Sequence, residues 1–82
     1  MTYTYKTRGT CSRSIEIDID ENNIVKNVAF NGGCDGNTKG IASLVRDMPA
    51  NEVIAKLENI RCGFKSTSCP DQLAKALREI TK

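Results

Sequence analysis

The sequence predicts an α+β fold in which a three-stranded antiparallel sheet is followed by three helices packed on one of its faces. Alternating apolar and polar residues up to position 30 are typical of strands with one buried face. After position 38, apolar residues recur at helical spacing in three segments. Strand patterns and helix patterns are thus separated along the chain. Its 82 residues suffice for one domain, expected over 1–82.

The predicted sheet has three strands that follow one another along the chain. Residues 2–7 alternate tyrosines with polar residues, residues 14–20 form the clearest strand, and residues 24–30 return after a turn at 21–23. The inward residues are expected to be Ile15, Ile17, Ile19, Val28 and Phe30. Glu16, Asp18 and Asp20 alternate with the isoleucines, so we expect them on the solvated face.

Three helices are predicted at about 38–47, 50–57 and 70–80, with Pro49 separating the first two. Each has an apolar stripe that should face the sheet. The stripes are Ile41, Leu44, Val45 and Met48 in the first helix, Val53, Ile54 and Leu57 in the second, and Leu73, Ala74 or Ala76, Leu77 and Ile80 in the third.

Four cysteines and no histidine are the main chemical feature of the sequence: Cys11, Cys34, Cys62 and Cys69. All four lie at the ends of predicted elements, and the hairpin should bring Cys11 and Cys34 to one end of the sheet. If the last helix begins at that end, the thiolates converge in a set that suits Zn²⁺ first and an iron–sulfur cluster second. Two disulfides, or buried free cysteines, are the alternatives.

The stretch Thr67-Ser68-Cys69-Pro70-Asp71 marks the start of the last helix. Proline is favoured at the first helical position, which predicts Cys69 as the N-cap and Asp71 as a first-turn acid. A thiol at that position faces unpaired backbone N–H groups, which favour the thiolate. Cys69 is therefore predicted to be a metal ligand or a reactive thiol.

Several function classes are not supported by the sequence. A net charge of +2 without a basic cluster gives no indication of nucleic-acid binding. No apolar run is long enough for a membrane helix, and no apolar signal core begins the chain, so a cytoplasmic location with reduced cysteines is expected. The glycine-rich bend at 31–38 lacks the spacing of a phosphate loop.

The string T-S-C-P-D, preceded by Cys62-Gly63, resembles the TSCPD domain family over nearly the whole chain, and the four cysteines match its small stand-alone branch. The family is known as a C-terminal appendage of cobalamin-dependent ribonucleotide reductases. The resemblance implies a link to deoxynucleotide synthesis and association with ribonucleoside-diphosphate reductase activity. A chain of 82 residues cannot house the reductase barrel, so no catalysis by this chain alone is expected.

A more distant resemblance is to the U-type iron–sulfur scaffold proteins. It is carried by Cys11, the hairpin at 15–30, and Gly33-Cys34 before a helix rich in small residues. It implies a similar fold with ligands at Cys11, Cys34 and Cys69. This chain departs from the scaffolds at Arg13 and Ser68, where they carry an acid and often a histidine.

The sequence thus favours a small four-cysteine metal-binding domain, with a ribonucleotide reductase or another redox enzyme as its partner. One alternative is a thiol–disulfide redox protein that uses Cys62 and Cys69. Another is a nucleotide-sensing or protein-interaction module, for which Lys39, Arg46, Lys65 and Arg78 are the candidate basic residues. The sequence does not determine the oligomeric state.

Overall fold

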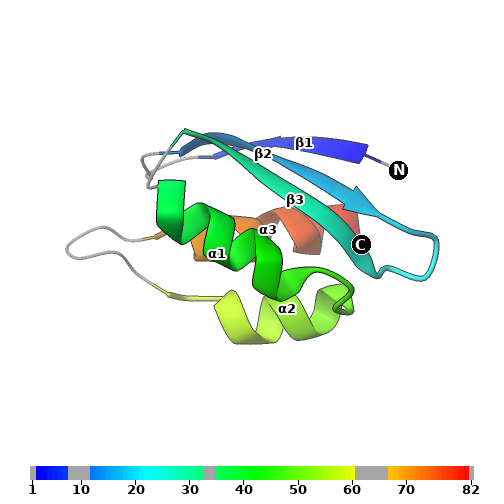
Figure 1. The fold of residues 1–82 in the computed structure, drawn as a ribbon. Helices are drawn as coiled ribbons and strands as arrows, with labels where there is room; N and C mark the ends of the chain where they lie inside the picture. Colours follow the sequence, from blue (N-terminus) through cyan, green and yellow to red (C-terminus); the bar gives the residue numbers. More distant parts are fainter. Residues whose placement is uncertain (1, 8–11, 33–34, 61–66, 82) are drawn as a thin grey trace.

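The computed structural model describes residues 2–7, 12–32, 35–60 and 67–81. Three strands precede three helices along the chain, which confirms the predicted α+β architecture (Figure 1). The elements are β1 (Thr2–Lys6), β2 (Ser12–Ile19), β3 (Val25–Gly32), α1 (Asp35–Val45), α2 (Ala50–Leu57) and α3 (Cys69–Ile80).

The sheet is an antiparallel meander in which the spatial order β1-β2-β3 repeats the sequence order. The central strand β2 aligns Ile17 with Tyr3 on one side and with Val28 on the other. Its three isoleucines, Ile15, Ile17 and Ile19, are no more than 2% exposed. The predicted inward face of this strand is therefore confirmed.

A bulge in β3 changes the predicted inward pattern of that strand. Asp18 pairs with Asn27, but its neighbour Ile19 pairs with Val25, so Lys26 is an extra residue in β3. The extra residue lets Val25 and Val28 both face the core while Lys26 and Asn27 are exposed. Strict alternation predicted Val28 correctly but did not include Val25, which is fully buried.

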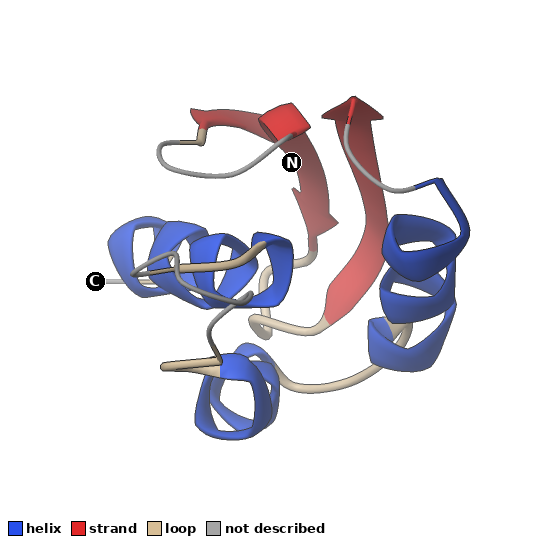
Figure 2. Ribbon diagram, turned by 90° about the vertical axis from the view of Figure 1, so that its left-hand side faces the viewer, coloured by secondary structure: helices blue, strands red, loops and turns tan. Residues whose placement is uncertain are grey.

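All three helices lie on the same side of the sheet. Figure 2 shows α1 beneath β3, α3 beneath the other two strands, and α2 below as an outer layer. Buried residues of α2 and α3 complete the core with the isoleucines of β2: Ala50, Val53, Ile54, Leu73, Ala76 and Leu77. None of the helices in the described ranges has the length and apolar character needed to cross a bilayer.

The first helix differs from its prediction in one core residue. It begins at Asp35, earlier than predicted, and buries Thr38 and Val45 while Ile41 is half-buried. These positions are separated by three and four residues and so share one helix face. Leu44 lies to the side of that face and is 77% exposed, so its predicted burial was wrong.

Two long-range contacts close the fold. The backbone of residues 47–50 runs along the start of β3, with hydrogen bonds from Asp47 N to Val25 O (2.7 Å) and from Val25 N to Met48 O (2.9 Å). At the opposite edge, β1 lies against α3, and Tyr3, Tyr5, Ala76 and Ile80 line an open groove between them. Elements distant in sequence therefore support both edges of the sheet.

Candidate functional site

The start of α3 contains the one cysteine among the described residues, Cys69. Helix α3 begins at Cys69 itself, and Ser68 is its N-cap, with extended backbone angles and a side chain that accepts a hydrogen bond from Asp71 N (3.2 Å). The predicted N-cap role of Cys69 was therefore wrong by one residue. Serine is the better cap because its oxygen accepts the bond from the backbone N–H, which sulfur does only weakly.

Asp71 was predicted as a first-turn acid, and its side chain is buried, with 3% exposure. Its carboxylate accepts hydrogen bonds from the Thr67 hydroxyl and from the backbone N–H of Asn59 (2.8 Å). Lys75 Nζ lies 3.4 Å from Oδ2 one turn further along α3. A buried carboxylate with these partners joins the start of α3 to the residues that follow α2.

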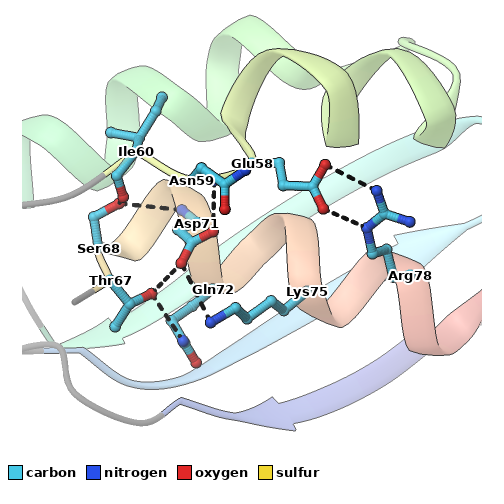
Figure 3. A network of polar contacts seen from close by, with 9 residues as sticks. All are labelled: Glu58, Asn59, Ile60, Thr67, Ser68, Asp71, Gln72, Lys75 and Arg78. Carbon is cyan, nitrogen blue, oxygen red and sulfur yellow. Dashed lines mark hydrogen bonds and ion pairs between the residues drawn. The ribbon is translucent and has the colours of Figure 1, made fainter.

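Ser68 makes the second connection between these two segments. Its hydroxyl donates to the carbonyl oxygen of Ile60 while it accepts from the N–H of Asp71 (Figure 3). The Thr67 hydroxyl is also both a donor and an acceptor: it donates a hydrogen bond to Asp71 and accepts one from Gln72 Nε2 at 3.0 Å. We call these six residues the Asp71 network: Asn59, Ile60, Thr67, Ser68, Asp71 and Gln72.

The Asp71 network favours an ionised carboxylate. Burial alone raises the pKa of Asp71. The hydrogen bonds from Thr67 and Asn59 and the charge of Lys75 together lower the pKa by more than burial raises it, so the pKa lies below its ordinary value. No buried side-chain nitrogen or oxygen within the described ranges lacks a hydrogen-bond partner. The network is thus satisfied internally.

A surface ion pair joins the same two helices further along α3. Arg78 donates to both carboxylate oxygens of Glu58, from Nε at 2.7 Å and from Nη2 at 2.8 Å. The hydrogen bond from Arg78 lowers the pKa of the Glu58 carboxyl group. Among the basic residues considered for nucleotide binding, Arg78 is therefore engaged by the fold, Lys39 and Arg46 are exposed, and Lys65 lies outside the described residues.

Three of the four predicted ligands, Cys11, Cys34 and Cys62, lie outside the described residues. Within the described part of the chain, no group of three or more histidine, cysteine or acidic residues is close enough to hold a metal ion. The four-cysteine site therefore stays a prediction. Its remaining member, Cys69, is partly exposed.

The described neighbours of the cysteines lie at one end of the molecule. Ser12, next to Cys11 in sequence, pairs with Gly32 at the end of β3. Asp35, next to Cys34, begins α1. Figure 1 shows these positions and the start of α3 at the same end, opposite the hairpin turn between β2 and β3.

The Asp71 carboxylate is engaged by the protein itself. Asp71 is the acid nearest to Cys69 in sequence, but its oxygens are already occupied by the Asp71 network and Lys75. The four thiolates predicted from the sequence are a donor set that would fit Zn²⁺ or an iron–sulfur cluster.

Sequence reasoning did not identify Thr67, Asn59 or the buried role of Asp71. The available signal was the spacing of Ser68 and Asp71, which is that of a capping box. In a capping box the acid bonds back to the backbone N–H of the cap residue. Here the Asp71 carboxylate instead binds Thr67 and Asn59, which only the tertiary structure reveals.

A family model described as TSCPD domain matches residues 1–81 of the chain. No curated protein and no solved structure matches the chain.

Proposed function

Since the chain belongs to the TSCPD domain family, we propose that it is a small metal-binding module with Cys11, Cys34, Cys62 and Cys69 as thiolate ligands. Zn²⁺ is the first choice and an iron–sulfur cluster the second. The main support for this proposal is that Cys69 begins α3 at the same end of the molecule as the Ser12–Gly32 pair and Asp35, which adjoin Cys11 and Cys34. Ligands from four separate places in the sequence would tie the sheet to α1 and α3.

The proposed role of the metal is structural. A bound Zn²⁺ with four thiolates has no open coordination position, and it would act as a cross-link. The protein residues supply attachment points in regular elements: Cys69 is the first residue of a capped helix, Ser12 beside Cys11 belongs to a paired strand, and Asp35 beside Cys34 begins α1. Reduced thiols of this kind fit the cytoplasm, which is the location we propose.

Metal content and thiol accessibility test this proposal directly. The chain is purified anaerobically, and its metals are measured by elemental analysis and by its visible spectrum. Thiols are then titrated with and without a chelator. One zinc per chain, with all thiols protected until the chelator is added, supports the proposal. Iron absorbance selects the cluster instead. A metal-free chain with four reactive thiols contradicts both and favours the Cys62–Cys69 redox pair.

We also propose that the module is an accessory of a ribonucleotide reductase or another redox enzyme, and not a catalyst itself. Family membership supports this link. Direct binding to the reductase of the same cell, measured by calorimetry with the metal-loaded chain, is the expected result. Absence of binding to both reduced and oxidised reductase would contradict a direct partnership.

A further inference from the structure

We propose that Thr67, Ser68 and Asp71 are positioning residues for Cys69, holding together the two chain ends that flank residues 61–66. This inference rests on the proposed thiolate site. It assigns a role to the polar residues of the T-S-C-P-D stretch, which surround the cysteine without being ligands.

Two hydrogen bonds join the chain on either side of residues 61–66. The Ser68 hydroxyl donates a hydrogen bond to the carbonyl oxygen of Ile60, which directly precedes residues 61–66. Asp71 binds the N–H of Asn59 at 2.8 Å. The two ends of the intervening segment are therefore joined by two bonds, one from each side of Cys69 in the sequence (Figure 3).

The residues that make these bonds from the start of α3 are buried. Thr67 and Ser68 are each 4% exposed and Asp71 is 2% exposed, whereas Cys69, between them, is partly exposed. Buried hydrogen bonds to a charged group are stronger than exposed ones, and they fix the backbone around them. The cysteine therefore lies, partly exposed, between two anchored positions.

The backbone of Asn59 has an uncommon conformation. Its φ of 69° is in the left-handed region, which asparagine tolerates better than most residues. Asn59 follows Glu58, the C-cap residue at which the backbone has already left the α2 helix, and the N–H of Asn59 reaches Asp71. Residues following α2 are thus held in a turn that leads toward the start of α3.

Such a connection matters for a metal site because ligands held in place lose less conformational freedom when the ion binds. Cys62 is two residues beyond Ile60 in sequence, and Cys69 directly follows Ser68. Fixing Ile60 against Ser68 raises the effective concentration of one thiol near the other.

Thr67 and Asn59 donate to the two oxygens of the same Asp71 carboxylate, so loss of the Thr67 hydroxyl should release that carboxylate from its position against Asn59. The test compares Thr67→Val, which removes the hydroxyl at nearly constant size, with Thr67→Ser, which keeps it. Glu58→Gln is the control, because it weakens the other connection between α2 and α3 without touching the Asp71 network. Urea unfolding gives the stability of each variant, so that changes at the thiols can be separated from changes in stability.

The first readout is zinc affinity, measured by competition with a chromophoric chelator. We expect Thr67→Val to lower it at least about tenfold, while Thr67→Ser and Glu58→Gln stay within about twofold of the unchanged chain. Equal losses in Thr67→Val and Glu58→Gln at equal stability would overturn the positioning role.

The second readout needs no metal, so it distinguishes failure of this inference from failure of the proposed function. In a chain with Cys11→Ser and Cys34→Ser, the Cys62–Cys69 disulfide is equilibrated with reduced and oxidised glutathione in a chelator. Each disulfide formed converts one oxidised glutathione into two reduced molecules. If the chain binds no zinc, this readout alone decides: Thr67→Val should reduce the effective concentration at least about tenfold. An unchanged value overturns the inference.

Discussion

At the scale of single residues, Asp20 shows how one carboxylate shapes the hairpin. Its Oδ1 accepts hydrogen bonds from the backbone N–H groups of Asn22 and Ile24, both at 2.9 Å. Between them, Asn23 adopts a φ of 60°, which completes the turn. The sequence analysis placed Asp20 with Glu16 and Asp18 on the solvated face, but Asp20 has this additional structural role.

The bonds to Asp20 predict a pH-dependent stability. The Ile24 N–H is the largest cause of its lowered pKa. Burial is the second-largest effect and raises the pKa, while the Asn22 N–H and Lys26 lower it, so the pKa lies below its ordinary value. Because the folded-state pKa is depressed, the stabilisation is present above the unfolded value, near 4, and is lost as the pH falls through the folded value.

Asp20→Asn should therefore be less stable than the unchanged chain at neutral pH, and the difference should shrink as the pH falls below about 4. Urea unfolding at a series of pH values from neutral to acid measures it. A difference that stays constant across the series would contradict the role of the ionised carboxylate.

At the scale of elements, the two leucines Leu44 and Leu77 show what helical spacing can and cannot predict. Both lie in predicted apolar stripes, yet Leu77 of α3 is fully buried and Leu44 of α1 is 77% exposed. The spacing predicts a stripe correctly, but not how far a helix is rotated against the sheet. Helix α1 packs against β3, and the burial of Thr38 and Val45 shows which face of the helix is turned inward.

Truncation of these two leucines should have very different effects. Leu77→Ala leaves a cavity in the core and should cost about 2–5 kcal/mol of unfolding free energy. Leu44→Ala should change the stability by less than about 0.5 kcal/mol, since the side chain is in solvent. Urea unfolding of both variants checks this, and similar losses would mean that Leu44 is covered in solution.

At the scale of the whole molecule, the order of elements, the core of β2 and the helix positions were predictable because each has its own periodicity. The bulge at Lys26 was not, because one extra residue leaves no signal in composition. The Asp71 network was not either, because it joins Asn59 to residues beyond position 66 through tertiary contacts. The convergence of the four cysteines stays a prediction.

The proposed site predicts a stability that depends on metal. A chain of 82 residues buries a small core, so a cross-link of thiolates would contribute a large share of its stability. Addition of a strong chelator should lower the melting temperature by about 10 °C or more, and added zinc should restore it. Thermal unfolding followed by circular dichroism measures both, and an unchanged melting temperature contradicts a structural metal.

The packing of β1 against α3 has a consequence for the order in which the chain can fold during synthesis. Tyr3 and Tyr5 belong to β1, which is synthesised before β2 and β3, while Ala76 and Ile80 belong to α3, which follows α1 and α2. The strands can pair early, because neighbours in the sheet are neighbours in sequence. Until α3 has left the ribosome, however, the apolar side of the sheet lacks the residues with which α3 covers it, so the complete core can form only after α3 has been synthesised.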